Sequence, residues 1–394
     1  MNSEILKSEV QKFIHENLST DIHKILLKGS PFANVSAQEL VEQIESKNKA
    51  KEKLPSWFKA ENIFYPNKLN LSQTSSEVTA HYKASLLDGK SLVDITGGLG
   101  IDTFAFSSVM DQVLHIEKNQ DLAKIAKYNF TQLGIENVEF QTAEGIDFLK
   151  KSHRKFDIVY ADPSRRDGEN KKVYFLSDSE PDITQHLEFL FSIADTILIK
   201  TAPMLDIQIG LTQLSNVVEI HVVAVNNDVK EILWLLNKKN SIPPLLKTVN
   251  FTMPRPQLFE FDTTKEPSTS PSYALPKNYL YEPNAAILKS GGFKQVGHQF
   301  NLEKLHVNSH LYTSTTLFSF PGRVFKILEV LDYSKKALKH FNIQKANITT
   351  RNFPDSVSQV RKKIGLKDGG DIYIFCTTDL NEKLCLLVCN RIRY

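Results

Sequence analysis

The segment at residues 93–102, which reads VDITGGLGID, constrains the fold of this chain more than any other stretch. Residues 91–95 form a short apolar run with one acid, the composition of a buried strand in a parallel sheet. Glycines then break the strand, and residues 101–106 predict a helix. A strand, a glycine turn and a helix N-terminus leave backbone N–H groups and the positive end of a helix dipole facing a ligand. A plain connection between strand and helix is the alternative for this loop taken alone.

Two residues separate this turn from the fingerprint of a dinucleotide-binding loop. A G-x-G-x-x-G match that begins at Gly98 requires a third glycine at position 103, where this chain has Thr103. Asp94 stands immediately before the turn, where its charge repels a pyrophosphate and attracts an ammonium or sulfonium group. An NAD-dependent dehydrogenase is therefore the least favoured interpretation.

The chain that follows alternates between strand and helix patterns. We expect strands at residues 112–116, 138–142, 156–161 and 196–200, and helices at residues 121–133, 145–150, 182–194 and 205–214. Two strands without an intervening helix, at residues 217–225 and 231–236, close the series. Repeated strand–helix units predict a parallel sheet with helices on both faces, and the closing pair predicts an antiparallel last strand.

The sequence before and after this alternation has a different character. Residues 1–60 show helical spacing, with a basic stretch formed by Lys47, Lys49, Lys51 and Lys53. We interpret that stretch as a solvated helix face, with an RNA contact as the alternative. Residues 240–275 are rich in Pro, Ser and Thr and indicate a domain boundary, and a small mixed element follows at residues 277–320.

The C-terminal part predicts a second α/β arrangement. From residue 321 onward the pattern predicts a helix at 323–341, a strand at 346–350, a helix at 356–366, and strands at 371–376 and 383–389. This order is typical of a ferredoxin-like α/β sandwich. Cys376, Cys385 and Cys389 lie in apolar strand sequence, so we expect three buried thiols and neither a disulfide framework nor a zinc site.

Composition sets broad limits on function. The 394 residues suffice for two or three domains, and the formal net charge of +3 is too small to indicate a nucleic-acid partner by itself. The first residues lack a basic region followed by an apolar one, and no apolar run reaches the roughly 20 residues that span a bilayer. We therefore expect a cytoplasmic protein that needs no membrane.

Polar residues follow the predicted strands of the central sheet. Asp162 and Pro163 come after a buried apolar run, and Arg165 and Arg166 follow closely. The two arginines either bind phosphate or pair with neighbouring acids. Lys200 ends the next strand, where approach to a substrate and a solvated side chain are both open. Because ligands of open α/β sheets lie at the carboxyl ends of the strands, we expect these residues at one rim.

The segment before the first strand is also a candidate. Residues 71–80 read LSQTSSEVTA, and hydroxyl residues with Glu77 at capping-box spacing predict a helix start. Contact with a ligand is the alternative for Gln73, Thr74 and Ser75. No pattern indicates a Ser/His/Asp triad, a Cys/His pair or a set of metal ligands.

These motifs together resemble a known family. Asp94 and the glycine turn are similar to the first motif of class I S-adenosylmethionine-dependent methyltransferases. Residues 162–166, DPSRR, resemble the Asp/Asn-Pro-Pro-aromatic loop of enzymes that methylate exocyclic amino groups, although Ser164 replaces the second proline and Arg165 the aromatic residue. With residues 73–77, residues 200–206 and the C-terminal module, the chain resembles a bacterial family of methyltransferases with a THUMP-like domain. The catalytic part of that family is similar to the cap-guanosine N2 methyltransferases.

The resemblance implies an architecture. We expect an α/β protein with a seven-stranded, Rossmann-like class I methyltransferase sheet, a helical N-terminal part and a C-terminal ferredoxin-like/THUMP-like α+β module. The expected domains are a helical N-terminal domain (1–70), the methyltransferase core (71–240), a linker with a small ferredoxin-like element (241–320), and a THUMP-like domain (321–394).

The resemblance also implies roles for individual residues. S-adenosylmethionine is the implied cofactor, with Asp94 and the glycine loop at its methionine end, Glu117 at its ribose and Glu144 at its adenine side. Glu144 is alternatively a helix-capping acid, and the two roles are compatible. The implied cofactor-binding residues are Gln73, Thr74, Ser75, Asp94, Thr96, Gly97, Gly98, Gly100, Asp102, Glu117, Lys118, Glu144, Gly145 and Asp162. The implied catalytic residues are Asp162, Pro163, Arg165 and Lys200.

The implied substrate is an exocyclic amine of a base, guanine N2, in structured RNA such as a tRNA or rRNA. A cluster of basic residues supports RNA, with solubilising helix faces as the alternative. Its members are Lys335, Lys336, Lys339, His340, Lys345, Arg351, Arg361, Lys362, Lys363 and Lys367. Two further hypotheses stay open, namely a methyltransferase acting on a protein or small molecule and a non-catalytic RNA-binding protein with a vestigial cofactor fold.

Overall fold

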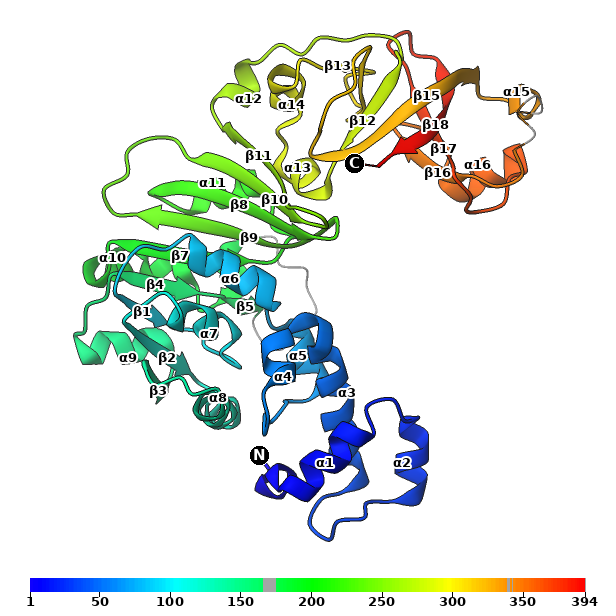
Figure 1. Cartoon of the computed structure of the whole chain (residues 1–394). Coiled ribbons are helices and arrows are strands. Elements are labelled where there is room, and N and C mark those ends of the chain that lie inside the picture. The colour runs from blue at the N-terminus through cyan, green and yellow to red at the C-terminus, as the bar shows by residue number, and fades with distance from the viewer. Residues whose placement is uncertain (166–174, 339–340, 342, 394) are drawn as a thin grey trace. The chain divides into compact units, whose positions relative to one another are not determined.

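The computed structural model describes residues 1–165, 175–338, 341 and 343–393 (Figure 1). The chain forms two compact units. The first comprises Met1–Asn216 with Trp234–Asn240, and the second comprises Val217–Leu233 with Ser241–Tyr394. No helix in the described ranges is long and apolar enough to cross a bilayer.

Short helices build the N-terminal part of the first unit. They are η1 (Ser3–Leu6), α1 (Ser8–Glu16), α2 (Ile22–Lys28), α3 (Ala37–Lys53), α4 (Pro55–Lys59) and α5 (Lys68–Gln73). The basic stretch on α3 is only partly a solvated helix face, because several of its lysines make contacts within the protein. Lys47 is buried, Lys49 donates to the Ser72 hydroxyl at 2.5 Å, and Lys53 donates to the Leu71 carbonyl at 2.9 Å. These two contacts attach α3 to α5 and account for both lysines without RNA.

A parallel sheet forms the centre of the first unit, as the alternation predicts. Its strands are β1 (Ser91–Asp94), β2 (Gln112–Glu117), β3 (Val138–Thr142), β4 (Ile158–Ala161) and β7 (Thr196–Thr201). β1 pairs in parallel with β2 and β4, β2 with β3, and β4 with β7. The accompanying helices are α6 (Glu77–Ser85), α7 (Ile101–Ser107), α8 (Gln120–Gln132), α9 (Gly145–Ser152), η2 (Leu176–Asp178), η3 (Ile183–His186), α10 (Leu187–Ile193) and α11 (Ile207–Gln213). A short ladder joins β5 (Ser164–Arg165) to β6 (Ser179–Glu180).

The full sheet has nine strands, in the order β11-β10-β8-β9-β7-β4-β1-β2-β3. The predicted closing pair is β8 (Val217–Val225) and β9 (Asp228–Asn237). Beyond the seven expected strands, β10 (Leu245–Phe251) pairs in parallel with β8, and β11 (Gln257–Asp262) pairs antiparallel with β10. Part of the stretch expected to contain a linker therefore forms paired strands. Its prolines flank the strands, while Leu246, Val249 and Phe259 are buried.

A second sheet organises the remainder of the second unit, in the order β13-β14-β12-β15-β18-β17-β16. Its strands are β12 (Tyr279–Pro283), β13 (Glu303–Lys304), β14 (Tyr312–Ser314), β15 (Gly322–Asp332), β16 (Asn347–Arg351), β17 (Ile372–Thr378) and β18 (Leu384–Ile392). Its helices are α12 (Lys265–Ser268), α13 (Ala285–Ser290), α14 (Phe293–Gln299), α15 (Lys335–Leu338) and α16 (Val357–Ile364). The three cysteines are free thiols and are buried, as expected.

One element of this unit contradicts the sequence prediction. Residues 323–341 were expected to form a helix, but β15 occupies Gly322–Asp332 and pairs antiparallel with both β12 and β18. A register shift between Ile327 and Glu329 interrupts the ladder with β18. Because such a bulge breaks the two-residue alternation of side chains, the apolar spacing of this strand imitates a helix.

The start of α6 is where the sequence places it, but its cap differs. The Ser76 side chain accepts from the Thr79 N–H at 3.3 Å and caps the helix. Glu77 instead accepts from the Ser56 N–H at 2.8 Å, at the start of α4. The helix start is therefore present, but Glu77 does not complete a capping box, because its carboxylate contacts another helix.

Candidate functional site

The glycine turn packs tightly against β2. A Cβ atom on Gly97 would lie 2.3 Å from the His115 ring, and one on Gly100 would lie 2.8 Å from Phe130. Gly100 also has φ +85° and caps the N-terminus of α7, a conformation that favours glycine. Gly145 begins α9 against β1, where a Cβ would lie 2.4 Å from the Ile95 carbonyl oxygen. Close packing therefore requires glycine at positions 97 and 100 within the turn and at position 145 at the start of α9.

Gly98 differs from its neighbours. It has φ +54°, and a Cβ built on it meets nothing closer than the Thr96 carbonyl oxygen at 3.9 Å. Its N–H donates to the Glu117 carboxylate at 2.7 Å. The Gly98 backbone therefore borders open space beside the end of β2, the position expected for a ligand.

Asp94 ends β1 beneath the turn and is 1% exposed. Its carboxylate accepts from the Thr96 N–H at 3.0 Å and from the Thr103 hydroxyl at 2.8 Å. Burial raises the pKa of Asp94 to about 7, although these hydrogen bonds act in the opposite direction. Thr103 also contacts Nδ1 of His115 at 2.9 Å, and burial lowers the pKa of that histidine to about 3.

Asp102, on α7, is the centre of a buried polar cluster. It accepts from the Ser75 hydroxyl at 2.9 Å and the Tyr160 hydroxyl at 2.7 Å, and Lys83 lies 3.2 Å from its other oxygen. Burial opposes ionisation of Asp102, but Lys83 and then Lys200 outweigh it and hold the pKa below its usual value. The sequence analysis missed Lys83 and Tyr160.

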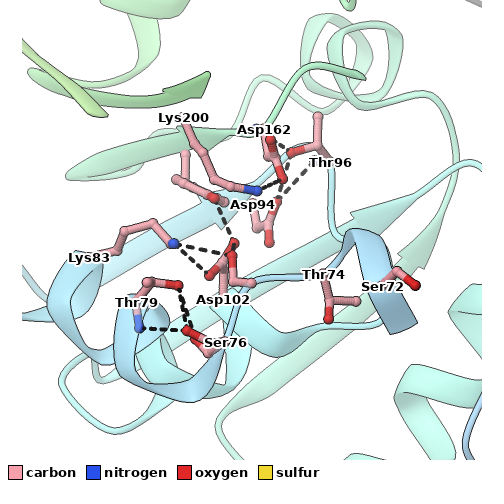
Figure 2. A network of polar contacts seen from close by, with 12 residues as sticks. Ser72, Thr74, Ser76, Thr79, Lys83, Asp94, Thr96, Asp102, Asp162 and Lys200 are labelled. Carbon is pink, nitrogen blue, oxygen red and sulfur yellow. Dashed lines mark hydrogen bonds and ion pairs between the residues drawn. The ribbon is translucent and has the colours of Figure 1, made fainter. Parts of the chain in front are cut away.

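Asp162 and Lys200 meet at the same rim (Figure 2). They form a short ion pair, in which the side chain of Lys200 is 12% exposed and that of Asp162 is 35% exposed. The Asp162 N–H donates to the Thr96 hydroxyl at 2.7 Å, which ties the end of β4 to the glycine turn. Lys200 is therefore a paired side chain and not a solvated one.

Glu117 and Glu144 occupy the ends of β2 and β3. Glu117 accepts from the backbone N–H groups of Gly98 and Asn119, each at 2.7 Å. Glu144 caps α9 by accepting from the Asp147 N–H at 2.7 Å, so its alternative role as a capping acid is present. Lys118 forms an ion pair with Glu180 at 2.7 Å.

The predicted segment at residues 73–75 divides into two. Ser75 is buried and belongs to the Asp102 cluster. Thr74 donates to the Leu71 carbonyl at 3.0 Å and stands apart from that cluster in Figure 2. Gln73 is exposed at the end of α5.

The structure does not describe the side chains of the two predicted arginines, Arg165 and Arg166. The backbone of Arg165 pairs with Ser179 in the β5–β6 ladder, which begins directly after Asp162 and Pro163. The side chain of Arg165 and the whole of Arg166 lie outside the described residues. Across the described ranges, no group of His, Cys, Asp and Glu side chains is arranged to hold a metal ion.

The predicted basic cluster of the second unit is partly neutralised. Arg351 pairs with the buried Glu282 at 2.8 Å, and Arg361 pairs with Asp368 at 2.6 Å. Lys363 lies 4.0 Å from Asp355. The residues of this cluster that fall outside the description are Lys339, His340 and the side chain of Lys335.

The strand order β3-β2-β1-β4-β7-β9-β8, with a glycine turn after the first strand and carboxylates at the ends of the next two, defines the class I methyltransferase fold. Family models match the C-terminal part, as a ferredoxin-like domain at residues 279–321 and a THUMP domain-like region at residues 322–391. No curated protein sequence matches the chain.

Solved structures extend the comparison to the whole chain. The crystal structure of a "putative methyltransferase" from Porphyromonas gingivalis W83 is 34% identical, with a TM-score of 0.89, and the match covers 99% of each chain. This chain belongs to the same family as that protein, and it combines a methyltransferase fold with ferredoxin-like and THUMP-like domains.

More distant structures match a smaller share of the chain. They include an rRNA methylase from Streptococcus thermophilus, which is 14% identical with a TM-score of 0.31 over 41% of this chain and 95% of that chain. A methyltransferase from Geobacter sulfurreducens is 16% identical with a TM-score of 0.31 over 41% of this chain and 78% of that chain. Those similarities are too low to inform on activity.

Proposed function

We propose that this protein is an S-adenosylmethionine-dependent methyltransferase that acts on an exocyclic amino group of a base in structured RNA. The observation that carries the proposal is the meeting of Asp94 and Asp162 at one rim, joined through Thr96. One carboxylate is buried beside the glycine turn, and the other is partly exposed to receive a substrate. Membership of a methyltransferase family supports the reaction class.

The residues at the rim fit the proposed cofactor in their chemistry. Asp94 offers a carboxylate to a cationic group, the backbone of Gly98 borders open space, and Glu117 retains lone pairs for two hydroxyl donors. Glu144 and Gly145 lie at the next strand end, on the adenine side in this proposal. When bound, S-adenosylmethionine supplies a methyl group already activated by a positively charged sulfur.

Asp162 is the residue proposed to receive the acceptor amine. One of its oxygens takes the Lys200 ammonium, and among the described residues no donor occupies the other. That free oxygen accepts an N–H of the amine and turns the nitrogen lone pair toward the methyl carbon. The nitrogen–carbon bond forms as the carbon–sulfur bond breaks, and the proton then leaves the nitrogen for water. The ion pair with Lys200 fixes the orientation of Asp162. This matters because positioning and electrostatics supply most of the barrier reduction in such a reaction.

RNA is the proposed acceptor because of the second unit. Residues 322–391 match a THUMP domain-like model, and the last turn of α16 carries Arg361, Lys362 and Lys363. A cationic surface attracts a phosphate backbone, although the ion pairs of Arg361 and Lys363 reduce its net charge. Guanine N2 is the proposed atom, on the resemblance of residues 162–166 to enzymes that methylate exocyclic amines.

The test combines a variant with an inventory of modified nucleosides. Asp162→Ala should abolish methylation while cofactor affinity, measured by calorimetry, changes by less than about tenfold, or about 1.4 kcal/mol. The same variant should fail to restore a modified nucleoside that mass spectrometry finds missing from RNA of a deletion strain. Asp111→Asn, at an exposed position before β2, is the matched control and should restore it.

Three outcomes contradict parts of the proposal. Unchanged turnover of Asp162→Ala removes the role of that residue. RNA of identical composition in the deletion strain, with methylation of a protein or small molecule by the purified enzyme, moves the acceptor to another class. Absence of cofactor binding leaves a non-catalytic RNA-binding protein.

A further inference from the structure

Asp94, Asp102 and Asp162 form a group of three aspartates at the rim of the first unit, and among the described residues two of the three are paired with an ammonium group. Asp102 is paired with Lys83, and Asp162 is paired with Lys200 (Figure 2). Asp94 receives the Thr96 N–H, the Thr96 hydroxyl and the Thr103 hydroxyl, all of them neutral donors. In the described part of the chain, Asp94 therefore forms no ion pair with a lysine or arginine.

The groups that face Asp94 from the neighbouring elements leave this charge uncompensated. Asp102 on α7 and Asp162 after β4 are both acids and both oppose ionisation of Asp94. His115 on β2 contacts Thr103 and stays neutral, because burial lowers its pKa to about 3. The hydroxyl of Tyr160, on β4, donates to Asp102.

A fully buried carboxylate without a cation is costly in its charged form, so it takes up either a proton or a positively charged ligand. We infer that Asp94 exchanges its proton for the cationic end of the methyl donor when the donor binds. This inference rests on the proposed function, because it requires S-adenosylmethionine as the ligand. The proton leaves Asp94 for solvent, and no bond other than that O–H bond is broken.

The consequence is a binding affinity that depends on pH. Below about pH 7 the free protein holds Asp94 protonated, since burial raises its pKa to about 7. Donor binding must then expel that proton, and affinity should rise by up to about tenfold per pH unit until Asp94 is ionised. The α-amino group of the donor stays protonated below its ordinary pKa of roughly 7.7–8.0, so pH 5.5–7.0 isolates the protein group.

Calorimetry on the full-length protein tests this without any turnover. S-adenosylmethionine is titrated at pH 6.0 in two buffers of different ionisation enthalpy, and the difference in heat gives the protons released. We expect close to one proton released per donor bound, and an affinity that increases from pH 5.5 to 7.0. Asp94→Asn should release none and bind with little pH dependence, whereas Asp111→Asn, at an exposed position, should behave as wild type.

A second ligand separates the two positive charges of the donor. S-adenosylhomocysteine keeps the ammonium group but lacks the sulfonium charge. Release with both ligands assigns the exchange to the ammonium, and release with S-adenosylmethionine alone assigns it to the sulfonium. Either result supports the inference.

The wild-type measurement alone can overturn the inference, so it does not depend on the folding of Asp94→Asn. Binding of S-adenosylmethionine without proton release, at equal affinity across pH 5.5–7.0, would remove the exchange while leaving the proposed function intact. Absence of binding at every pH would remove the proposed function, and the exchange with it.

Discussion

At the scale of single residues, the buried pair of Lys83 and Asp102 determines the arrangement of the rim. The Lys83 side chain is fully buried, 3.2 Å from Asp102, and it also donates to the Ser75 hydroxyl at 3.1 Å. A buried ion pair adds little when intact, but the loss of one partner leaves the other charge buried and uncompensated. The segment before β1 is therefore attached to α7 through charge as well as packing.

We predict that Lys83→Met lowers the free energy of unfolding by about 3–5 kcal/mol, because Asp102 then stays buried with one cation fewer. Urea denaturation measures the change. Lys90→Met, at an exposed lysine, is the control and should change stability by about 0.5 kcal/mol or less. The double variant Lys83→Met/Asp102→Leu should recover part of the loss, and a loss equal to that of the single variant would contradict this account.

Sequence reasoning found some residues of the rim because their chemistry follows from chain order. Asp94, Asp162 and Lys200 each end or follow a strand, and parallel strands bring their carboxyl ends to one edge. Lys83 and Tyr160 escaped because nothing in one sequence marks a lysine or a tyrosine as buried. Both residues contact Asp102, which lies on α7, whereas Lys83 lies on α6 and Tyr160 on β4.

At the scale of elements, helix α8 attaches the N-terminal helices to the sheet. Asn129 is fully buried, and its side chain both donates to the Phe64 carbonyl and accepts from the Phe64 N–H, each at 2.9 Å. Phe130, the next residue, packs edge to face against Trp57 of α4. One turn of α8 thus satisfies the backbone of the connecting segment and fills the space beside it.

Asn129→Ala should destabilise the protein by about 1–3 kcal/mol for each backbone group left without a partner. Opening should be local, so limited proteolysis is expected to cut near Phe64 before the sheet region is degraded. Lys127→Ala, at an exposed position on α8, tests whether any alanine in this helix has the same effect. Simultaneous digestion of both regions in Asn129→Ala would show that the attachment is not local.

The order of elements in the first unit was predictable, whereas parts of the second were not. The central strands carry apolar runs bounded by turn residues, which give a clear signal. β15 carries a bulge that disturbs its alternation, and β10 and β11 lie between prolines that indicated a boundary. Pairing with more distant segments, β18 for β15 and β8 for β10, overrode the local pattern, and β11 then pairs with β10.

At the scale of the whole molecule, two carboxylates in different units respond to pH in opposite directions. The hydrogen bond from His221 and the contact with Lys247 lower the pKa of Glu219 to about 2, against the effect of burial. Glu219 thus stabilises the fold above its ordinary pKa of 4.5, and this contribution is lost as the pH falls toward about 2. Asp94, with a pKa raised to about 7, contributes stability below its ordinary pKa of 3.8 that is lost as the pH rises toward 7.

Unfolding measured without ligand from pH 2.5 to 7.5 should separate the two groups. Glu219→Gln should remove about 1–3 kcal/mol of the acid-induced loss between pH 4.5 and 2.5. Asp94→Asn should remove the decline between pH 4 and 7, so each variant is the control for the other. A wild-type stability that stays flat from pH 4 to 7 would show that Asp94 ionises without cost.

The His115 ring beneath Gly97 has a consequence for ligand recognition. Because the ring fills the space under the turn from the protein side, the loop has its shape before any ligand arrives. A loop that is preorganised loses little conformational entropy when a ligand binds, so more of the contact energy remains as affinity. A methyl group added at position 97 would meet the His115 ring and would deform the loop from the protein side.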